Sequence, residues 1–210
     1  MAHVPNTGSL KTCSEPNSRC LLTRHNDPKR KLQYTLEVIY GPTSWVGVNT
    51  QTPNRLVAQA LRQRFLPHWQ PFAQVEAEVR INPETRIDFC LHDGATATTA
   101  ERRHFIEVKN VSMSVNGTAL FPDANTSRGR KHIRELVELI NGSPQTSAEL
   151  LFVVQRSDCE QFATADDIDA EYGLLLREAY QNGLQVTCLT CSLGPDGVTL
   201  SDRQLLYHPA

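Results

Sequence analysis

The sequence predicts an α/β (α+β) fold in which a small β-module precedes a larger domain built around a central mixed sheet. Three observations support this class. Residues 1–50 combine β-rich stretches with turn residues and show no helical period. From Pro53 the apolar residues follow a helical period, and beyond it predicted strands alternate with predicted helices. We therefore place a β-module over residues 1–50 and an α/β domain over residues 51–210.

The composition is that of a globular protein. Of the 210 residues, 40% are hydrophobic and 21% charged, which excludes wholesale disorder. The longest apolar run, residues 150–154, is far too short to span a bilayer. The first residues lack the basic and apolar stretches of a secretory signal. We expect a cytoplasmic protein with no membrane partner.

The β-module is predicted from strand propensity and turn residues. Strands are expected over 20–24, 32–40 and 45–48, with turns where Asn, Asp, Gly and Pro cluster between them. Tyr34 and Trp45 are candidates for stacking on nucleic-acid bases, although packing within the module is the more common role for aromatic residues on apolar strands. Both interpretations stay open from the sequence.

The second domain is predicted from a change of period. Its first helix starts near Pro53, a residue that suits the first turn of a helix. The run at 150–155 is almost continuously apolar, which is typical of a strand buried on both faces. The remaining elements are expected as strands over 75–80, 86–91, 104–111 and 184–191 and as helices over 127–140 and 171–181.

The cysteines and histidines give no metal signature. Without a secretory signal, the six cysteines are expected to be reduced. Cys188 and Cys191 form a Cys-x-x-Cys pair, which is either redox-active, half of a zinc site or simply buried. Since they lie on a predicted strand with no second ligand pair nearby, we favour burial. The seven histidines show no ligand spacing, so no histidine metal site is expected.

Charge is distributed unevenly along the chain. Residues 1–64 carry nine basic and three acidic side chains, whereas residues 158–210 carry two basic and nine acidic ones. This asymmetry suggests a polyanionic partner that meets one face of the protein. Lys29, Arg30 and Lys31 are candidate phosphate contacts, with a solvated surface run as the alternative.

One pair of predicted strands carries candidate catalytic chemistry. Glu107 and Lys109 are two residues apart and share one strand face, and Asp88 lies beside Glu107 if the two strands are neighbours. Two carboxylates suit a hard divalent cation, and Lys109 can orient a water or stabilise charge on a phosphate. This Asp…Glu-x-Lys pattern resembles the signature of the PD-(D/E)xK nuclease superfamily.

Further polar residues are candidates to support such a site. Arg128 and Lys131 lie in the first turns of a predicted helix, where a phosphate is favoured. Gln155 and Arg156 end the buried strand, at the position where ligand crevices form in α/β sheets. Asp123 follows a proline in a loop and either supports the metal site or only forms a turn.

A succession of short motifs resembles the sugar fermentation stimulation protein (SfsA) family over about residues 3–185. The motifs, in order, are Pro5-Asn6-Thr7-Gly8, Pro28-Lys29-Arg30-Lys31, Tyr34-Thr35-Leu36-Glu37, Trp45-Val46-Gly47-Val48-Asn49-Thr50, Pro53-Asn54, Arg86-Ile87-Asp88-Phe89, Glu107-Val108-Lys109, Phe121-Pro122-Asp123-Ala124, Arg128-Gly129 and Phe152-Val153-Val154-Gln155-Arg156. The family pattern starts some strands earlier, so we expect this module to lack its opening strands.

The resemblance implies an OB-like β-module joined to a nuclease-like domain. It implies that Asp88, Glu107 and Lys109 are the catalytic set, and that Glu78 joins Asp88 and Glu107 as a ligand of Mg²⁺ or Mn²⁺. It also implies DNA as the partner, without strong sequence preference, and a link to sugar metabolism, especially that of maltose. Three functions remain open: a metal-dependent nuclease, a non-catalytic DNA-binding regulator, and a protein whose polyanion is not a nucleic acid.

Overall fold

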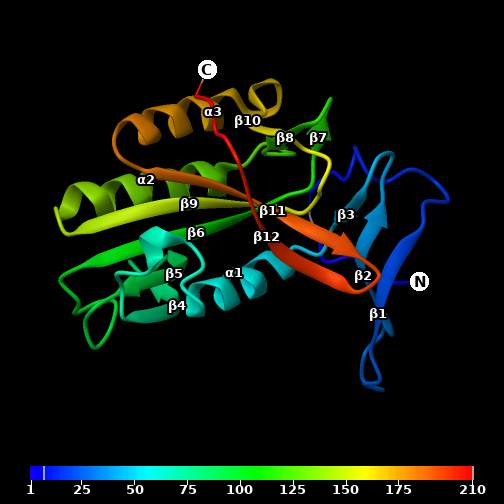
Figure 1. Cartoon of the computed structure of the whole chain (residues 1–210), viewed down its shortest axis with the longest axis horizontal. Helices are drawn as coiled ribbons and strands as arrows, with labels where there is room; N and C mark the ends of the chain where they lie inside the picture. The colour runs from blue at the N-terminus through cyan, green and yellow to red at the C-terminus, as the bar shows by residue number, and fades with distance from the viewer. Residues whose placement is uncertain (7, 210) are drawn as a thin grey trace.

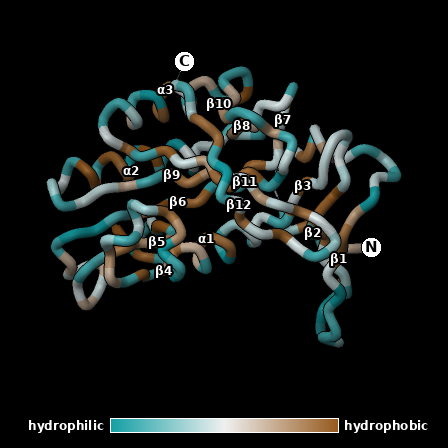
Figure 2. Tube along the Cα trace, in the orientation of Figure 1, coloured by the Kyte–Doolittle hydropathy of each residue, from teal (hydrophilic) through white to brown (hydrophobic). Residues whose placement is uncertain are grey.

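The computed structural model describes residues 1–6 and 8–209 and confirms the predicted α/β class (Figure 1). Its N-terminal part is a three-stranded antiparallel sheet of β1 (Cys20–Arg24), β2 (Tyr34–Tyr40) and β3 (Trp45–Gly47). This sheet encloses a small core of its own, formed by Cys13, Ile39, Val46 and Val48. The loop between β1 and β2 is strongly hydrophilic, as Figure 2 shows.

The second part is organised around a six-stranded mixed sheet with the strand order β12-β11-β9-β6-β5-β4. The three inner strands β6, β9 and β11 are parallel, and antiparallel strands flank them on both sides. β9 is buried along almost its whole length, as its apolar run predicts. The strands are β4 (Gln74–Arg80), β5 (Arg86–His92), β6 (Arg103–Val111), β9 (Thr146–Val154), β11 (Gln185–Gly194) and β12 (Gly197–Leu205).

Helices cover both faces of this sheet (Figure 1). α1 (Thr52–Arg62) and the short 3-10 helix η1 (Pro67–Trp69) pack on one face, with Trp69 fully buried. α2 (Ser127–Gly142) and α3 (Asp166–Gln181) pack on the other, over a second core that includes Phe152. The hydrophobic residues concentrate between these layers, as Figure 2 shows. The sheet thus has two chemically separate faces.

Several elements differ from the sequence expectation. β12 and a small sheet of β7 (Ser114–Val115), β8 (Thr118–Phe121) and β10 (Gln161–Thr164) lie where no element was expected. α3 starts at Asp166, five residues before the expected Glu171, and is kinked at Asp169. The buried Asp169 carboxylate accepts hydrogen bonds from the backbone N–H groups of Thr126 and Tyr172. These hydrogen bonds hold Asp169 in a non-helical backbone conformation, which local helix propensity does not predict.

Backbone contacts dock the N-terminal sheet onto the end of β9. The N–H of Gly47 donates to the Gln155 carbonyl at 2.8 Å, and Val46 forms a β-bridge with Arg156. A Cβ on Gly47 would lie 2.5 Å from the Gln155 side chain, so only glycine allows this approach. Within the described residues, no helix is long and apolar enough to cross a membrane.

Candidate functional site

The antiparallel pairing of β5 with β6 brings Asp88 and Glu107 together. The ladder ends at the pair Phe89 and Ile106, and just beyond it the Asp88 N–H donates to Glu107 Oε2 at 3.4 Å. The Asp88 carboxylate accepts hydrogen bonds from the Asn54 side-chain amide and from the Val108 N–H, both at 2.8 Å. A helix residue and a strand residue therefore fix the orientation of Asp88.

Glu107 lies deeper and is only 3% exposed. Lys109 donates from Nζ to Glu107 Oε1 at 2.7 Å, as expected for residues two apart on one strand. His132, from α2, contacts the same oxygen through Nδ1 and lies 3.2 Å from Lys109 Nζ. The three side chains form one network under the first turns of α2.

The two carboxyl groups have opposite pKa shifts. Burial and the nearby Glu107 carboxylate raise the pKa of Asp88 to about 6. Burial also acts to raise the pKa of Glu107, but Lys109 and His132 outweigh it and lower that pKa to about 2. The pair therefore concentrates negative charge that a cation or a proton would relieve.

Glu78 adds a third carboxylate to this place. It lines a pocket of about 400 Å³ together with Asp88, Glu107 and Arg128. Its backbone is left-handed, with φ at 54°, which is unusual for a residue other than glycine. The pocket offers oxygen donors from β4, β5 and β6, and this donor set fits a hard divalent cation such as Mg²⁺ or Mn²⁺.

The basic residues predicted near this site fall into two groups. Arg128 is exposed, lines the acidic pocket and donates from Nε to His132 Nε2 at 3.4 Å. Lys131, also on α2, lies 3.2 Å from the carboxylate of the exposed Glu84, another residue lining the pocket. Both remain available to a ligand that enters from solvent.

Gln155 and Arg156 differ from the sequence expectation, because both side chains are buried. Gln155 donates from Nε2 to the Asn49 carbonyl at 3.2 Å, and Arg156 forms an ion pair of 2.6 Å with Asp158. They hold the junction between the two parts of the chain rather than facing a crevice. Asp123 likewise accepts a hydrogen bond from the Ser9 N–H at 3.0 Å, which gives it a structural contact with the N-terminal loop.

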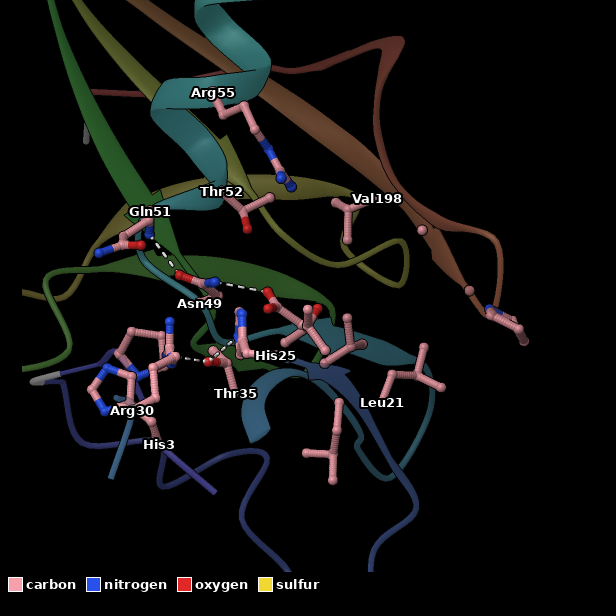
Figure 3. Close-up of a pocket in the computed structure, with 18 residues that line it drawn as sticks. His3, Leu21, His25, Arg30, Thr35, Asn49, Gln51, Thr52, Arg55 and Val198 are labelled. Carbon is pink, nitrogen blue, oxygen red and sulfur yellow. Dashed lines mark hydrogen bonds between the residues drawn. The ribbon is translucent and has the colours of Figure 1, made fainter. Parts of the chain in front are cut away.

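A second hollow, of about 520 Å³, lies between the N-terminal sheet and α1 (Figure 3). Arg30 and Arg55 line it, and Figure 3 shows the Arg55 side chain reaching into it from the helix. His3 and His25 also line it, while Lys29 and Lys31 are exposed in the neighbouring β1–β2 loop. Since Asn54 binds Asp88, one turn of α1 contributes to both hollows.

The sequence does not predict the contacts that two further residues make in this site. His132 lies in the first turns of α2 and contacts Glu107, which is 25 residues away, and no spacing in the sequence connects the two. Asn54 was noted only as part of a motif, and its hydrogen bond to Asp88 spans 34 residues. The Pro53-Asn54 motif at the start of a helix was the one available signal, and nothing local pointed from it to Asp88.

The fold defines a class of protein in which an N-terminal antiparallel module, an OB domain, is joined to an α/β domain with a mixed sheet. Two family models match the chain: the SfsA N-terminal OB domain over residues 1–48 and the sugar fermentation stimulation protein RE domain over residues 51–197. The chain therefore belongs to the sugar fermentation stimulation protein family.

Similar proteins agree with this assignment. A sugar fermentation stimulation protein homolog of Bdellovibrio bacteriovorus is 49% identical, over 97% of this chain and 86% of that protein. The homolog of Thermosynechococcus vestitus is 41% identical, over 94% of this chain and 80% of its own length. The solved structure of Pyrococcus furiosus SfsA in complex with Ca²⁺ superposes with a TM-score of 0.83 at 21% identity, covering 99% of this chain and 85% of that one, which shows that the fold is shared.

Proposed function

We propose that this protein binds DNA and hydrolyses phosphodiester bonds with a divalent cation, Mg²⁺ or Mn²⁺, held by Asp88, Glu107 and Glu78. The observation that carries the proposal is that these three carboxylates line one open pocket, with Lys109 Nζ 2.7 Å from Glu107. All the donors are oxygen atoms, as a hard cation requires. The Ca²⁺ complex of the Pyrococcus furiosus relative supports a site for such a cation in this fold.

The residues of the chain have distinct roles in this proposal. When bound, the cation supplies Lewis-acid polarisation of the phosphate and lowers the pKa of water. Lys109 stabilises negative charge as water attacks phosphorus and the ester bond to the leaving oxygen breaks. His132 and Asn54 act as positioning residues, since each holds a carboxylate in place from a helix. Arg128 lies at the rim of the pocket, where it can contact a flanking phosphate.

The bound strand is proposed to run from the acidic pocket to the hollow beside the N-terminal sheet. Arg30 and Arg55 there, with Lys29 and Lys31 on the adjacent loop, offer cations to phosphates without reading base edges. α1 connects the two places through consecutive residues, Asn54 and Arg55. Such contacts give salt-dependent binding with little sequence preference.

The proposal is tested by incubating labelled single- and double-stranded DNA with the purified protein and Mg²⁺, Mn²⁺ or a chelator. We expect metal-dependent cleavage, abolished in Asp88→Asn and reduced about 100- to 1000-fold in Lys109→Ala, with binding retained in both. Asp93→Asn is the matched control, because Asp93 is a carboxylate at the end of β5 that pairs with Arg102 away from the pocket. DNA bound but uncut by the wild type would instead support a non-catalytic DNA-binding regulator, such as one acting on sugar metabolism.

A further inference from the structure

A cluster of two histidines and a glutamate lies on the opposite face of the sheet. His104 on β6, Glu149 on β9 and His68 on η1 direct ligand atoms to one place, with all of these atoms within 4.8 Å of one another. Parallel pairing of β6 with β9 sets His104 beside Ser147, and Glu149 follows two residues later on the same face. This cluster shares no residue with the acidic pocket.

The separations match those between ligands of one tetrahedral zinc ion. Glu149 Oε2 lies 2.9 Å from His104 Nε2 and 3.2 Å from His68 Nε2. Metal–ligand bonds of about 2.0–2.2 Å in a tetrahedron place neighbouring ligand atoms about 3.3 Å apart. Small movements of the side chains therefore suffice to admit the ion.

The hydrogen bond at Nδ1 orients the His104 ring so that Nε2 faces the cluster. The Ser147 hydroxyl donates to the Arg103 carbonyl, so its oxygen accepts from His104 Nδ1, at 2.8 Å. Nε2, which donates to Glu149 Oε2 at 2.9 Å in the metal-free protein, is then the ring nitrogen that releases its proton and binds the ion when the metal enters. An outer hydrogen bond of this kind orients most histidine metal ligands.

Glu149 gives an independent sign that a cation belongs here. It is fully buried, and its Oε1 is a buried oxygen without a hydrogen-bond partner among the described residues. Trp69 donates from Nε1 to the other oxygen at 2.9 Å, which fixes the carboxylate without occupying Oε1. An unpaired carboxylate oxygen in the interior is costly unless a cation or donor satisfies it.

The surroundings provide a fourth donor and a route of entry. The Gln185 amide lies 2.9 Å from His68 Nε2, and a half-turn about its last torsion presents its oxygen to the same place. The His68 side chain is 34% exposed, so an ion reaches the cluster from solvent through this residue. Both features suit reversible loading of the site in the folded protein.

We propose that His68, His104 and Glu149 form a zinc site that joins η1 to strands β6 and β9. Two imidazoles and one carboxylate favour Zn²⁺ over Mg²⁺ or Ca²⁺, which prefer oxygen donors alone. The site is structural, because it lies on the face away from Asp88 and binds the segment after α1 to the centre of the sheet. This inference stands independently of the proposed nuclease function.

The test is titration of the metal-free full chain with Zn²⁺ by calorimetry, and with Co²⁺ by visible absorption. We expect one Zn²⁺ per chain, tetrahedral Co²⁺ bands and a higher Tm in the presence of Zn²⁺. Asp88→Asn should behave like the wild type, which separates this site from the acidic pocket. His68→Ala removes a partly exposed ligand and should weaken binding at least tenfold, with its Tm in chelator checked to show that it folds.

Ser147→Ala gives a second, milder variant. Ser147 is exposed, so its loss leaves the core intact, but it releases His104 Nδ1 and should weaken Zn²⁺ binding about 10- to 100-fold. Equal Zn²⁺ affinity in wild type, His68→Ala and Ser147→Ala would overturn the proposal. Binding lost in Asp88→Asn would overturn it as well, by placing the ion in the acidic pocket; no Zn²⁺ uptake by the wild type would show that the cluster is only a hydrogen-bonded network.

Discussion

Two buried glutamates, Glu107 on β6 and Glu149 on β9, lie on opposite faces of neighbouring strands and have different neighbours. Burial opposes ionisation of both. Lys109 and His132 nevertheless hold the pKa of Glu107 at about 2. Hydrogen bonds from His104 and His68 hold the pKa of Glu149 well below its usual range. Each glutamate is therefore charged, but for different reasons.

The surroundings of each glutamate decide which chemistry it supports. Glu107 borders an open pocket with three further carboxylates, which repel one another and attract hard cations and the phosphates that accompany them. Glu149 is enclosed by imidazoles and an indole, which offer nitrogen donors and exclude water. The type of cation that a buried carboxylate favours therefore depends on the side chains around it and not on the carboxylate itself.

The largest expected effect is on stability at the Glu149 face. His104→Ala, measured in chelator, leaves a buried carboxylate with one donor fewer and should lower the free energy of unfolding by about 3–5 kcal/mol. Urea unfolding followed by circular dichroism measures this. Ser147→Ala is the control and should cost less than about 1 kcal/mol. A His104→Ala variant as stable as the wild type would show that the buried Glu149 carboxylate does not depend on the hydrogen bond from His104.

A smaller effect of opposite sign is expected at the Glu107 face. Asp88→Asn removes a charge that burial and Glu107 make unfavourable, and in chelator at pH 7 it should raise the free energy of unfolding by about 1–2 kcal/mol. The gain is modest because the amide loses one of the two hydrogen bonds that Asp88 accepts. Asp93→Asn should give no such gain. Destabilisation by Asp88→Asn would show that the acidic pocket is not strained by its own charge.

The smallest effect concerns an acid that the protein satisfies by itself. A hydrogen bond from Arg156 holds the pKa of Asp158 well below its usual range, so this contact stabilises the fold above the unfolded pKa of about 3.9 and is lost as the pH falls toward the folded value. Asp158→Asn should cost about 1 kcal/mol at pH 7, after allowance for partial exposure. Unfolding at several pH values should show the difference from wild type shrinking below pH 4. A difference that stays constant with pH would contradict this account.

The main elements of the fold could be predicted because their signals are local. The strand β1 matches its predicted range of residues 20–24, and α2 begins at the predicted Ser127, although it continues to Gly142, two residues beyond its predicted end. The elements that were missed lack such signals. β7 has two residues, β10 has four, and β12 alternates polar residues along an edge of the sheet. Tertiary contacts, not local propensity, make them strands.

The candidate sites divide in the same way. Asp88, Glu107 and Lys109 lie within two adjacent strands, so strand geometry alone predicts that they meet. His68 and His104, by contrast, reach Glu149 across 81 and 45 residues, and no spacing rule connects them. The spacing of the histidines in the sequence does not indicate that they approach one another. The pairing of β6 with β9 and the placement of η1 supply what spacing cannot.

Both sites depend on residues of β6, so insertions or deletions in this strand have consequences for both. Alternate residues of β6 face opposite sides, with His104 toward η1 and Glu107 toward α2. A single-residue insertion or deletion within the strand would exchange these faces for every residue beyond it. One such event before His104 would therefore displace residues of both clusters at once. In this family member an insertion or deletion in β6 is therefore expected to be poorly tolerated.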